Sequence, residues 1–483
     1  MLALRPKSQE LRSCYIPSVR KLLRQHSRFF ILAILAGVAL RLLFIVRFPG
    51  VTSDSFVYGD IAKNWLQHGI YGLSGVNEIS PTCIRLPGYP AFLAALFAIF
   101  GIEPYRAVLV AQLFVDIGTC FLIADLARRL ISLRAARTAF LLAALCPFLA
   151  NYVANVLTET LEVFFTVLAL DLAIRALGTV DLQSTQAWAA CGFAVGAATL
   201  LRPDGALLLF AIVAYLLMLS LKQKRRAVAP APHLLWASLI LIAVSLASLV
   251  PWTLRNLHTL HQFQPLAPRY ANEENAFVPA GFNRWMKTWI VDYASVEEIY
   301  WAVPGNTLEA EKLPSRAFDS PGQQQQTIQL FDDYNRTTHV TPDLDARFAA
   351  LSEQRVHHSL LRYYVALPLL RIADMWLRPR TETLPSDTRW WEFDDDPEWL
   401  ALTISLGVLN LLYIGAAFAG LVRGRFTPHL GLLLTFVILR SAFLGTLENP
   451  EPRYTLECYP VVILLAAAWF AGKRRSEDTA QIT

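Results

Sequence analysis

The chain has 483 residues, of which 55% are hydrophobic and 17% are charged, and its mean hydropathy is +0.40. A soluble domain is typically about 45–50% apolar and about 25% charged, so this composition excludes an ordinary soluble protein. The formal net charge of +5 is small for the length, and the basic residues form short clusters between apolar runs, which argues against a nucleic-acid partner.

The apolar residues gather in runs of about twenty, the length that a helix needs to cross roughly 30 Å of hydrocarbon. These runs predict ten membrane spans, at about 29–48, 105–127, 138–152, 154–175, 187–201, 204–221, 234–252, 398–422, 428–447 and 455–472. With ten spans, every basic cluster falls on the same side as the basic N-terminal tail, and the positive-inside bias makes that side cytoplasmic. We therefore expect an all-α polytopic bundle with both termini in the cytoplasm.

The spans divide the chain into five parts: a cytoplasmic tail (1–28), an N-terminal membrane domain (29–252) with a first outer loop at 49–104, an outer region (253–397), C-terminal membrane helices (398–472) and a cytoplasmic tail (473–483). Within the first outer loop, the residues from Asp54 to Gln67 predict a helix. The apolar segment from Pro87 to Gly101 is only about 22 Å long as a helix. If this segment crossed the membrane, every later basic cluster would lie on the outer side, so we expect an interfacial or re-entrant helix on the outer face.

Two segments of the outer region have their own signatures. The polar stretch from Ser320 to Thr327 predicts a flexible segment. Residues 353–378 mix apolar and basic side chains and contain Pro368, which predicts a broken helix lying on the membrane surface.

This topology places polar side chains from distant parts of the chain at the outer ends of the spans. They are Asp54, Asp60, Arg85, Glu159, Arg202, Asp204, Arg255, Asn256, Glu448, Glu451 and Arg453. A transporter would more often place its ionisable groups near the middle of the bilayer. The one-sided cluster predicts a site at the water–lipid boundary, where a lipid-borne substrate would present its head group.

Asp54 is the candidate base of this site. Group transfer to a hydroxyl needs a carboxylate to accept the proton, and it needs positive charge beside a departing phosphate. The alternative is that Asp54 caps the helix that follows it, since T-S-D precedes the helical residues. Asp60 follows six residues later and does not share a helical face with Asp54, so the two carboxylates are not an obvious pair.

The other candidates also have structural alternatives. Glu159 lies just inside a span, where a carboxylate is costly unless it is paired or hydrated, and it could form a structural salt bridge. Arg202 and Asp204 flank Pro203, and the helix start there suits an anion, although the pair could simply form a charged turn. Arg85 and Arg255 lie on the outer side against the orientation bias, which favours phosphate binding over contact with lipid head groups.

Metal ligation has weaker support. The acidic run 394–396 adjoins a span and predicts a solvated flank, while His258/His261 and His357/His358 lack matching zinc ligands. The sequence therefore predicts no set of residues that would bind a cofactor, and the need for a divalent metal stays open. Ionisable residues in or near spans are expected to form structural ion pairs: Arg41, Asp116, Asp125 and Arg440.

Six motifs carry a family resemblance. They are TSDSFVYGDIAKNWLQHG (52–69), RLPGYPAFLAALF (85–97), LTETL (157–161), LLRPDGALL (200–208), PWTLRN (251–256) and EPRYTLECYP (451–460). In this order they resemble the GT-C glycosyltransferases, in the branch of the protein O-mannosyltransferases, the lipid A aminoarabinose transferases and the RgtA/B/C/D-like enzymes.

The resemblance implies a GT-C-type bundle, a polyprenyl-phosphate sugar donor and an inverting displacement, with Asp54 as the general base. It implies substrate-binding roles for Tyr58, Asp60, Arg85, Glu159, Arg202, Asp204, Arg255, Asn256, Glu448, Arg453 and Tyr454, the arginines contacting the donor phosphate. Many members carry Asp-Glu in the first motif, whereas Ser55 follows Asp54 here, which weakens the inference of a metal. The outer region also departs from the family, because it precedes the last three spans.

We therefore expect a glycosyltransferase in the cytoplasmic membrane of a bacterium, active on the periplasmic side. Its partners would be a polyprenyl-phosphate sugar, an acceptor hydroxyl on a glycan, lipid or protein, and the membrane lipids. The alternatives are a transporter or flippase for lipid-linked sugars, and a polysaccharide polymerase or ligase with its site in the outer region. The sugar and the acceptor stay open.

Overall fold

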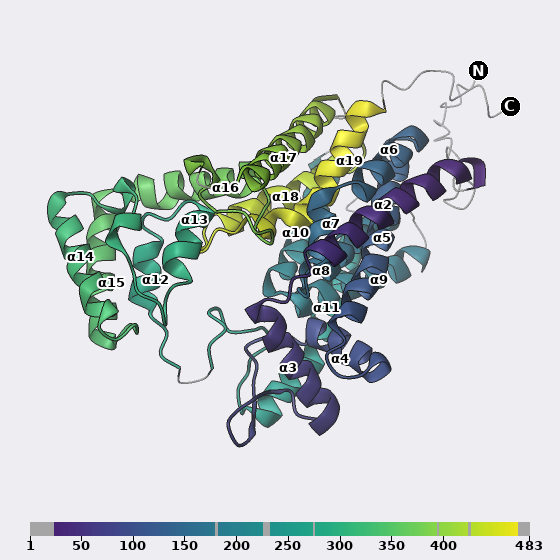
Figure 1. Cartoon of the computed structure of the whole chain (residues 1–483). Helices are drawn as coiled ribbons and strands as arrows, with labels where there is room; N and C mark the ends of the chain where they lie inside the picture. The colour runs from purple at the N-terminus through teal and green to yellow at the C-terminus, as the bar shows by residue number, and fades with distance from the viewer. Residues whose placement is uncertain are drawn as a thin grey trace, which may run out of the picture.

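A computed structural model of the chain shows an almost entirely helical molecule with a helical bundle on one side and a smaller helical lobe on the other (Figure 1). The structure describes residues 24–178, 182–225, 232–273, 276–393, 396–423 and 427–471. Most of the two predicted cytoplasmic tails lies outside these ranges, as do Asp394 and Asp395 of the acidic run.

The bundle contains the helices from the two predicted membrane domains. They are α2 (Ser27–Arg47), α5 (Tyr105–Leu130), α6 (Leu133–Ala144), α7 (Pro147–Val153), α8 (Glu159–Leu177), α9 (Leu182–Leu201), α10 (Leu207–Arg225), α11 (Pro232–Thr259), α17 (Pro397–Arg423), α18 (Leu430–Leu444) and α19 (Tyr459–Phe470). A 3₁₀ turn precedes α10 (Pro203–Ala206) and another precedes α19 (Pro452–Cys458).

The predicted membrane protein is confirmed, but the predicted count of ten spans is not. Among the described residues, five helices are long and apolar enough to cross a membrane, namely α2, α5, α10 with its 3₁₀ turn, α11 and α17. Helices α6 and α7 form a pair bent by 50° that would make a sixth span, and this bend interrupts the predicted span 138–152. Pro147 begins α7, where its missing N–H and fixed φ are tolerated. At 12 residues, α19 reaches only about 18 Å, so the predicted span 455–472 includes its 3₁₀ turn.

The two ends of the bundle differ in charge. Arg137 near the start of α6 lies 3.4 Å from His26, which precedes α2, and Arg423 at the end of α17 donates to the carbonyl of Trp469 near the end of α19. These basic residues therefore share one end, and α3, α4 and the outer lobe lie toward the other (Figure 1). The orientation of the basic end toward the cytoplasm stays a prediction from the charge bias.

The first outer loop forms a helix, a hairpin and a second helix: α3 (Ser53–His68), strands β1 (Gly72–Ser74) and β2 (Ile79–Pro81), which pair antiparallel, and α4 (Gly88–Phe100). Helix α3 confirms the helix predicted from Asp54 to Gln67. Thr52 occupies its N-cap, and its backbone N–H donates to the Ser55 hydroxyl at 2.9 Å, so the capping alternative for Asp54 is wrong. The 13 residues of α4 reach about 20 Å, which is too short to cross the bilayer.

The outer region folds as a lobe with its own apolar core. Its helices are α12 (Ala280–Met286), α13 (Tyr293–Ser295), α14 (Pro321–Asn335), α15 (Pro342–His358) and α16 (Leu367–Leu377). Trp285, Trp289 and Phe348 are fully buried among them. The prediction of a flexible segment from Ser320 to Thr327 is wrong, because the Ser320 hydroxyl caps α14 by accepting from the Gln323 N–H.

The predicted break within 353–378 is confirmed. Helix α15 ends at His358, a π turn spans Arg362–Ala366, and α16 follows with Pro368 in its first turn. Leu361, Leu369 and Leu370 are exposed on this segment. Its position on the membrane surface stays a prediction.

Candidate active site

The start of α3 is fixed to the connection between α7 and α8. The backbone of Gly50 pairs with that connection through two hydrogen bonds, to the Ala154 carbonyl (2.8 Å) and from the Val156 N–H (3.0 Å). A Cβ on Gly50 would lie 1.9 Å from the Asn155 side chain, so this approach requires glycine. The buried Ser55 hydroxyl donates to the Val156 carbonyl at 2.9 Å. The first turn of α3, which carries Asp54, is therefore held beside the start of α8.

Asp54 lies between two arginines. Its Oδ1 pairs with Arg85 at 2.7 Å, its Oδ2 lies 4.0 Å from Arg453, and about a third (34%) of the side chain is exposed. Burial raises the pKa of Asp54, but the charges of Arg85 and Arg453 outweigh it and hold the pKa below the ordinary value of an aspartate. Burial also raises the pKa of Tyr58 to about 12, so a neutral phenol ring lies against the Arg85 guanidinium, 5.7 Å from it.

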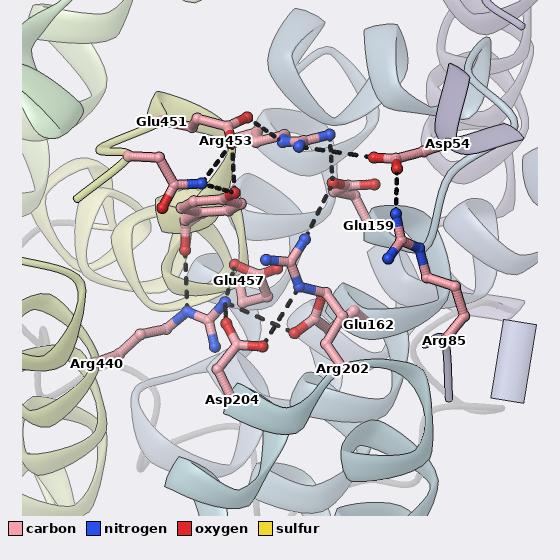
Figure 2. Close-up of polar contacts among 12 residues, drawn as sticks. Asp54, Arg85, Glu159, Glu162, Arg202, Asp204, Arg440, Glu451, Arg453 and Glu457 are labelled. Atoms are coloured by element: carbon pink, nitrogen blue, oxygen red, sulfur yellow. Dashed lines mark hydrogen bonds and ion pairs between the residues drawn. The ribbon is translucent and has the colours of Figure 1, made fainter. Parts of the chain in front are cut away.

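A network of ion pairs extends from Asp54 into the bundle (Figure 2). Arg202 lies 3.5 Å from both Glu159 and Glu162, and its Nε donates to Asp204 at 3.3 Å. We call the whole network the polar cluster; it consists of Asp54, Arg85, Glu159, Glu162, Arg202, Asp204, Arg440, Glu451, Arg453 and Glu457. The predicted convergence of Asp54, Glu159 and the arginines 85, 202 and 453 is therefore present in the structure.

Arg440 forms the deepest part of the polar cluster. It is 1% exposed and lies 2.9 Å from Asp204, 2.8 Å from Glu457 and 3.6 Å from Glu162. The structural ion pair predicted for Arg440 is confirmed, as is the pair of Arg41 with Asp116 at 2.5 Å. Glu457 was not predicted, and its only sequence signal is a carboxylate beside the last apolar run.

The loop before α19 closes the polar cluster. Arg453 pairs with Glu451 at 2.5 Å and lies 3.7 Å from Glu159. The Tyr454 ring lies 4.6 Å from the Arg202 guanidinium and 5.4 Å from that of Arg453, and its hydroxyl donates to Glu451. The motif at 451–460 thus joins residues from α3, α8 and the α9–α10 connection.

Six predicted site residues are not members of the polar cluster: Tyr58 and Tyr454 contact its arginines, and four others lie apart from it. Asp60 accepts from the backbone and the hydroxyl of Ser74, both at 2.7 Å, and so ties α3 to β1. Buried Asn256 donates to the Gln264 carbonyl, and buried Glu448 pairs with Arg269 at 3.0 Å.

Arg255 is the fourth of these residues. It donates to the backbone carbonyls of Tyr71 and Thr82, and its guanidinium lies 5.2 Å from the Tyr71 ring. The Tyr71 hydroxyl in turn donates to the carbonyl of Arg85 at 2.9 Å. These contacts connect Arg255 to the loop that carries Arg85, and its predicted contact with a donor phosphate stays a prediction.

A cavity of about 640 Å³ lies between the bundle and the outer lobe. From the bundle side it is lined by Asp54, Tyr152, Glu451 and Arg453 together with the start of α3, and from the outer region by a wall that contains six aromatic side chains. Asp54 thus belongs both to the polar cluster and to the cavity. In the part of the chain that the structure describes, no group of three or more His, Cys, Asp or Glu side chains is arranged to hold a metal ion.

The bundle, the outer lobe and the polar cluster at their junction define a polytopic membrane protein of the GT-C fold. Residues 81–250 match the family model described as dolichyl-phosphate-mannose-protein mannosyltransferase. The archaeal oligosaccharyltransferase AglB from Archaeoglobus fulgidus, solved with an inhibitory peptide and a dolichol-phosphate, matches with a TM-score of 0.52 at 12% identity, over 92% of this chain and 50% of that chain. ArnT from Cupriavidus metallidurans bound to undecaprenyl phosphate matches with a TM-score of 0.41 at 13% identity, over 92% of this chain and 78% of that chain.

The motif resemblance to the GT-C glycosyltransferases is confirmed by the family model and by the fold. The chain spans about half the length of the AglB chain that it matches. A comparison with curated protein sequences gives no match.

Proposed function

We propose that the chain is a glycosyltransferase that moves a sugar from a polyprenyl-phosphate carrier to an acceptor hydroxyl at the outer face of the membrane. The observation that carries the proposal is the position of Asp54, which faces the cavity and pairs with arginines of the polar cluster. A base at such a boundary can meet an acceptor on one side and a phosphorylated donor on the other. The matched family model, that of the dolichyl-phosphate-mannose-protein mannosyltransferases, supports the same donor class.

In this reaction the acceptor oxygen forms the bond to the anomeric carbon, and Asp54 accepts the hydroxyl proton. The bond from the anomeric carbon to the phosphate oxygen breaks, and the polyprenyl phosphate leaves with that electron pair. The displacement inverts the anomeric centre because the two oxygens lie on opposite faces of the sugar. Holding acceptor, donor and base together supplies much of the rate acceleration.

The arginines of the polar cluster suit the phosphate. Arg85 and Arg453 lie beside Asp54, and Arg202 is connected to it through Glu159 and Arg453. Guanidinium groups bind phosphate oxygens with directed hydrogen bonds. Their positive charge offsets the charge that develops on the departing phosphate. Because the basic ends of the helices lie at the opposite end of the bundle, we place this chemistry on the periplasmic side of a plasma membrane, with both termini in the cytoplasm.

The test is donor turnover by the full chain in lipid nanodiscs. The protein is incubated with synthetic polyprenyl-phosphate hexoses and pentoses and with a mixed acceptor pool, and released polyprenyl phosphate is measured by mass spectrometry. We expect protein-dependent release from one donor class, and loss of that release in Asp54→Asn. If the same donors cross a proteoliposome membrane intact and none is cleaved, the protein is a transporter and the proposal fails.

A further inference from the structure

The cavity beside Asp54 has a lining of unusual composition. Its outer wall includes Tyr270, Phe277, Tyr300 and Trp301, of which Phe277 is 51% exposed and Trp301 is 42% exposed. Large aromatic side chains left exposed on a concave surface are typical of a binding site. The wall is therefore built to cover flat, apolar faces of a ligand.

The charge of the cavity is negative. Four carboxylates line it, those of Asp54, Glu297, Glu382 and Glu451, against one guanidinium, that of Arg453. Asp54 and Glu451 pair with arginines, whereas within the described residues neither Glu297 nor Glu382 has an ion-pair partner within 4.0 Å. This side of the site therefore repels an anion, in contrast to the arginine-rich side that faces the bundle.

Two polar groups in the cavity wall lack partners. Both carboxylate oxygens of Glu382 and the hydroxyl of Tyr152 are buried without a hydrogen-bond partner in another described residue, and Tyr152 is only 2% exposed. Leaving such groups unpaired costs about 1–3 kcal/mol each. Both residues line the cavity, so we expect a ligand there to supply the missing partners once their polar atoms turn toward it.

The two unpaired groups are held in place by their surroundings. Thr383, next to Glu382, accepts a hydrogen bond from the Asn151 side chain at 2.6 Å, which ties the segment after α16 to the end of α7. The neighbouring Arg380 is engaged elsewhere, donating to the Tyr459 hydroxyl and the Pro452 carbonyl at 2.9 Å each. The segment that carries Glu382 is therefore held in place beside the cavity.

We propose that this cavity binds the acceptor, and that the acceptor is a carbohydrate chain without negative charge at its reacting end, bound by Glu382, Tyr152 and the aromatic wall. This inference rests on the proposed function, because it assigns the second substrate of the same site. A pyranose ring presents C–H groups on its faces, which pack on aromatic rings, and hydroxyls on its edge, which donate to carboxylates. Phosphorylated or uronic-acid acceptors would place like charges against Glu297 and Glu382.

A peptide acceptor is less well matched. Extended peptides are commonly bound by adding a strand to an exposed sheet edge. The strands of the described chain, β1 and β2, do not line the cavity.

The test is binding of the purified full chain in detergent to a glycan array that pairs neutral and amino-bearing oligosaccharides with uronic-acid and phosphorylated counterparts, beside a set of peptides. We expect saturable binding of a neutral or amino-bearing glycan, with its anionic counterpart weaker by about tenfold or more. Glu382→Gln and Tyr152→Phe should each weaken binding by about tenfold. The matched control is Glu311→Gln, an exposed glutamate of the same region that does not line the cavity.

Glu382→Gln replaces a buried carboxylate by an amide of the same size, so it is expected to fold, and the melting temperature checks this. Selective binding of anionic glycans or of peptides, no binding to the array, or full binding by a folded Glu382→Gln variant would each overturn the inference. Selective binding of neutral glycans without donor turnover would contradict the proposed function but not the inference. Turnover with anionic acceptors would contradict the inference but not the proposed function.

Discussion

Replacing Asp54 by Asn separates the role of a base from the role of an ion-pair partner. Asparagine keeps the size of the side chain but cannot accept the acceptor proton, and general-base catalysis contributes about 10²–10⁴ in rate. The turnover rate should fall by that factor, which corresponds to about 2.7–5.4 kcal/mol in activation free energy. Donor affinity should change much less, because the arginines of the polar cluster are retained.

The same substitution should leave the fold almost unchanged. About a third of the Asp54 side chain is exposed, and its pairs with Arg85 and Arg453 are 2.7 and 4.0 Å long. Partly exposed ion pairs contribute about 0–1 kcal/mol, and Arg453 keeps its pairs with Glu159 and Glu451. A loss of turnover without a matching loss in melting temperature is therefore the expected signature.

The assay measures initial rates of polyprenyl phosphate release in nanodiscs at saturating donor, with melting temperature recorded on the same sample. Asp60→Asn is the matched control, since it is the same change on the same helix at a carboxylate that binds Ser74. It should lower the melting temperature more than the rate per folded molecule. The reasoning is refuted if Asp54→Asn turns over within about threefold of the unaltered chain, far less than a base contributes.

Three further predictions follow from the same contacts. Arg85→Gln removes the main cation that lowers the pKa of Asp54, so this pKa should rise and the carboxylate should protonate at a higher pH. The acid limb of the pH–rate profile should therefore shift to higher pH. An unchanged acid limb would exclude Asp54 as the group that titrates there. Arg440→Gln leaves three buried carboxylates without this cation, which should cost about 3–5 kcal/mol of stability, and adding Glu457→Gln should restore part of the melting temperature; no recovery would contradict the pairing. Gly50→Ala should displace α3 and lower turnover by about 10²-fold, as a 1 Å misplacement of a catalytic group does, and a normal rate would show that the close approach is dispensable.

The location of the polar cluster was predictable because local sequence properties indicate on which side of the membrane each loop lies. Apolar run lengths and basic clusters fix which loops share a face, and that placed Asp54, Glu159 and Arg202 together although they lie far apart in sequence. The helix from Ser53 to His68 was predictable for the same reason, since helical character is read over neighbouring residues.

Other features depended on tertiary contacts that no local pattern contains. The donors of Arg255 reach carbonyls more than 170 residues away, so sequence alone could not separate a phosphate ligand from a positioning residue. The count of ten spans is not confirmed, because short helices such as α18 and α19 do not by themselves reach across a bilayer. The cavity was not predicted because most of its wall comes from the outer region, for which the sequence predicted no fold.

We expect Arg85 to couple donor binding to the strength of Asp54 as a base. Its Nε is buried without a hydrogen-bond partner in the described chain, while its Nη2 donates to Asp54 at 2.7 Å. A donor phosphate that accepts from Nε would offset part of the positive charge that now lowers the pKa of Asp54, so the pKa would rise as the donor binds. A carboxylate with a higher pKa is a stronger base, so Asp54 would gain basicity in the complex that needs it and stay ionised and paired in the free protein. Saturating polyprenyl phosphate should therefore raise the pH at which Asp54 titrates in the unaltered chain, and the rise should vanish in Arg85→Gln; an equal rise in both proteins would assign the phosphate to another arginine.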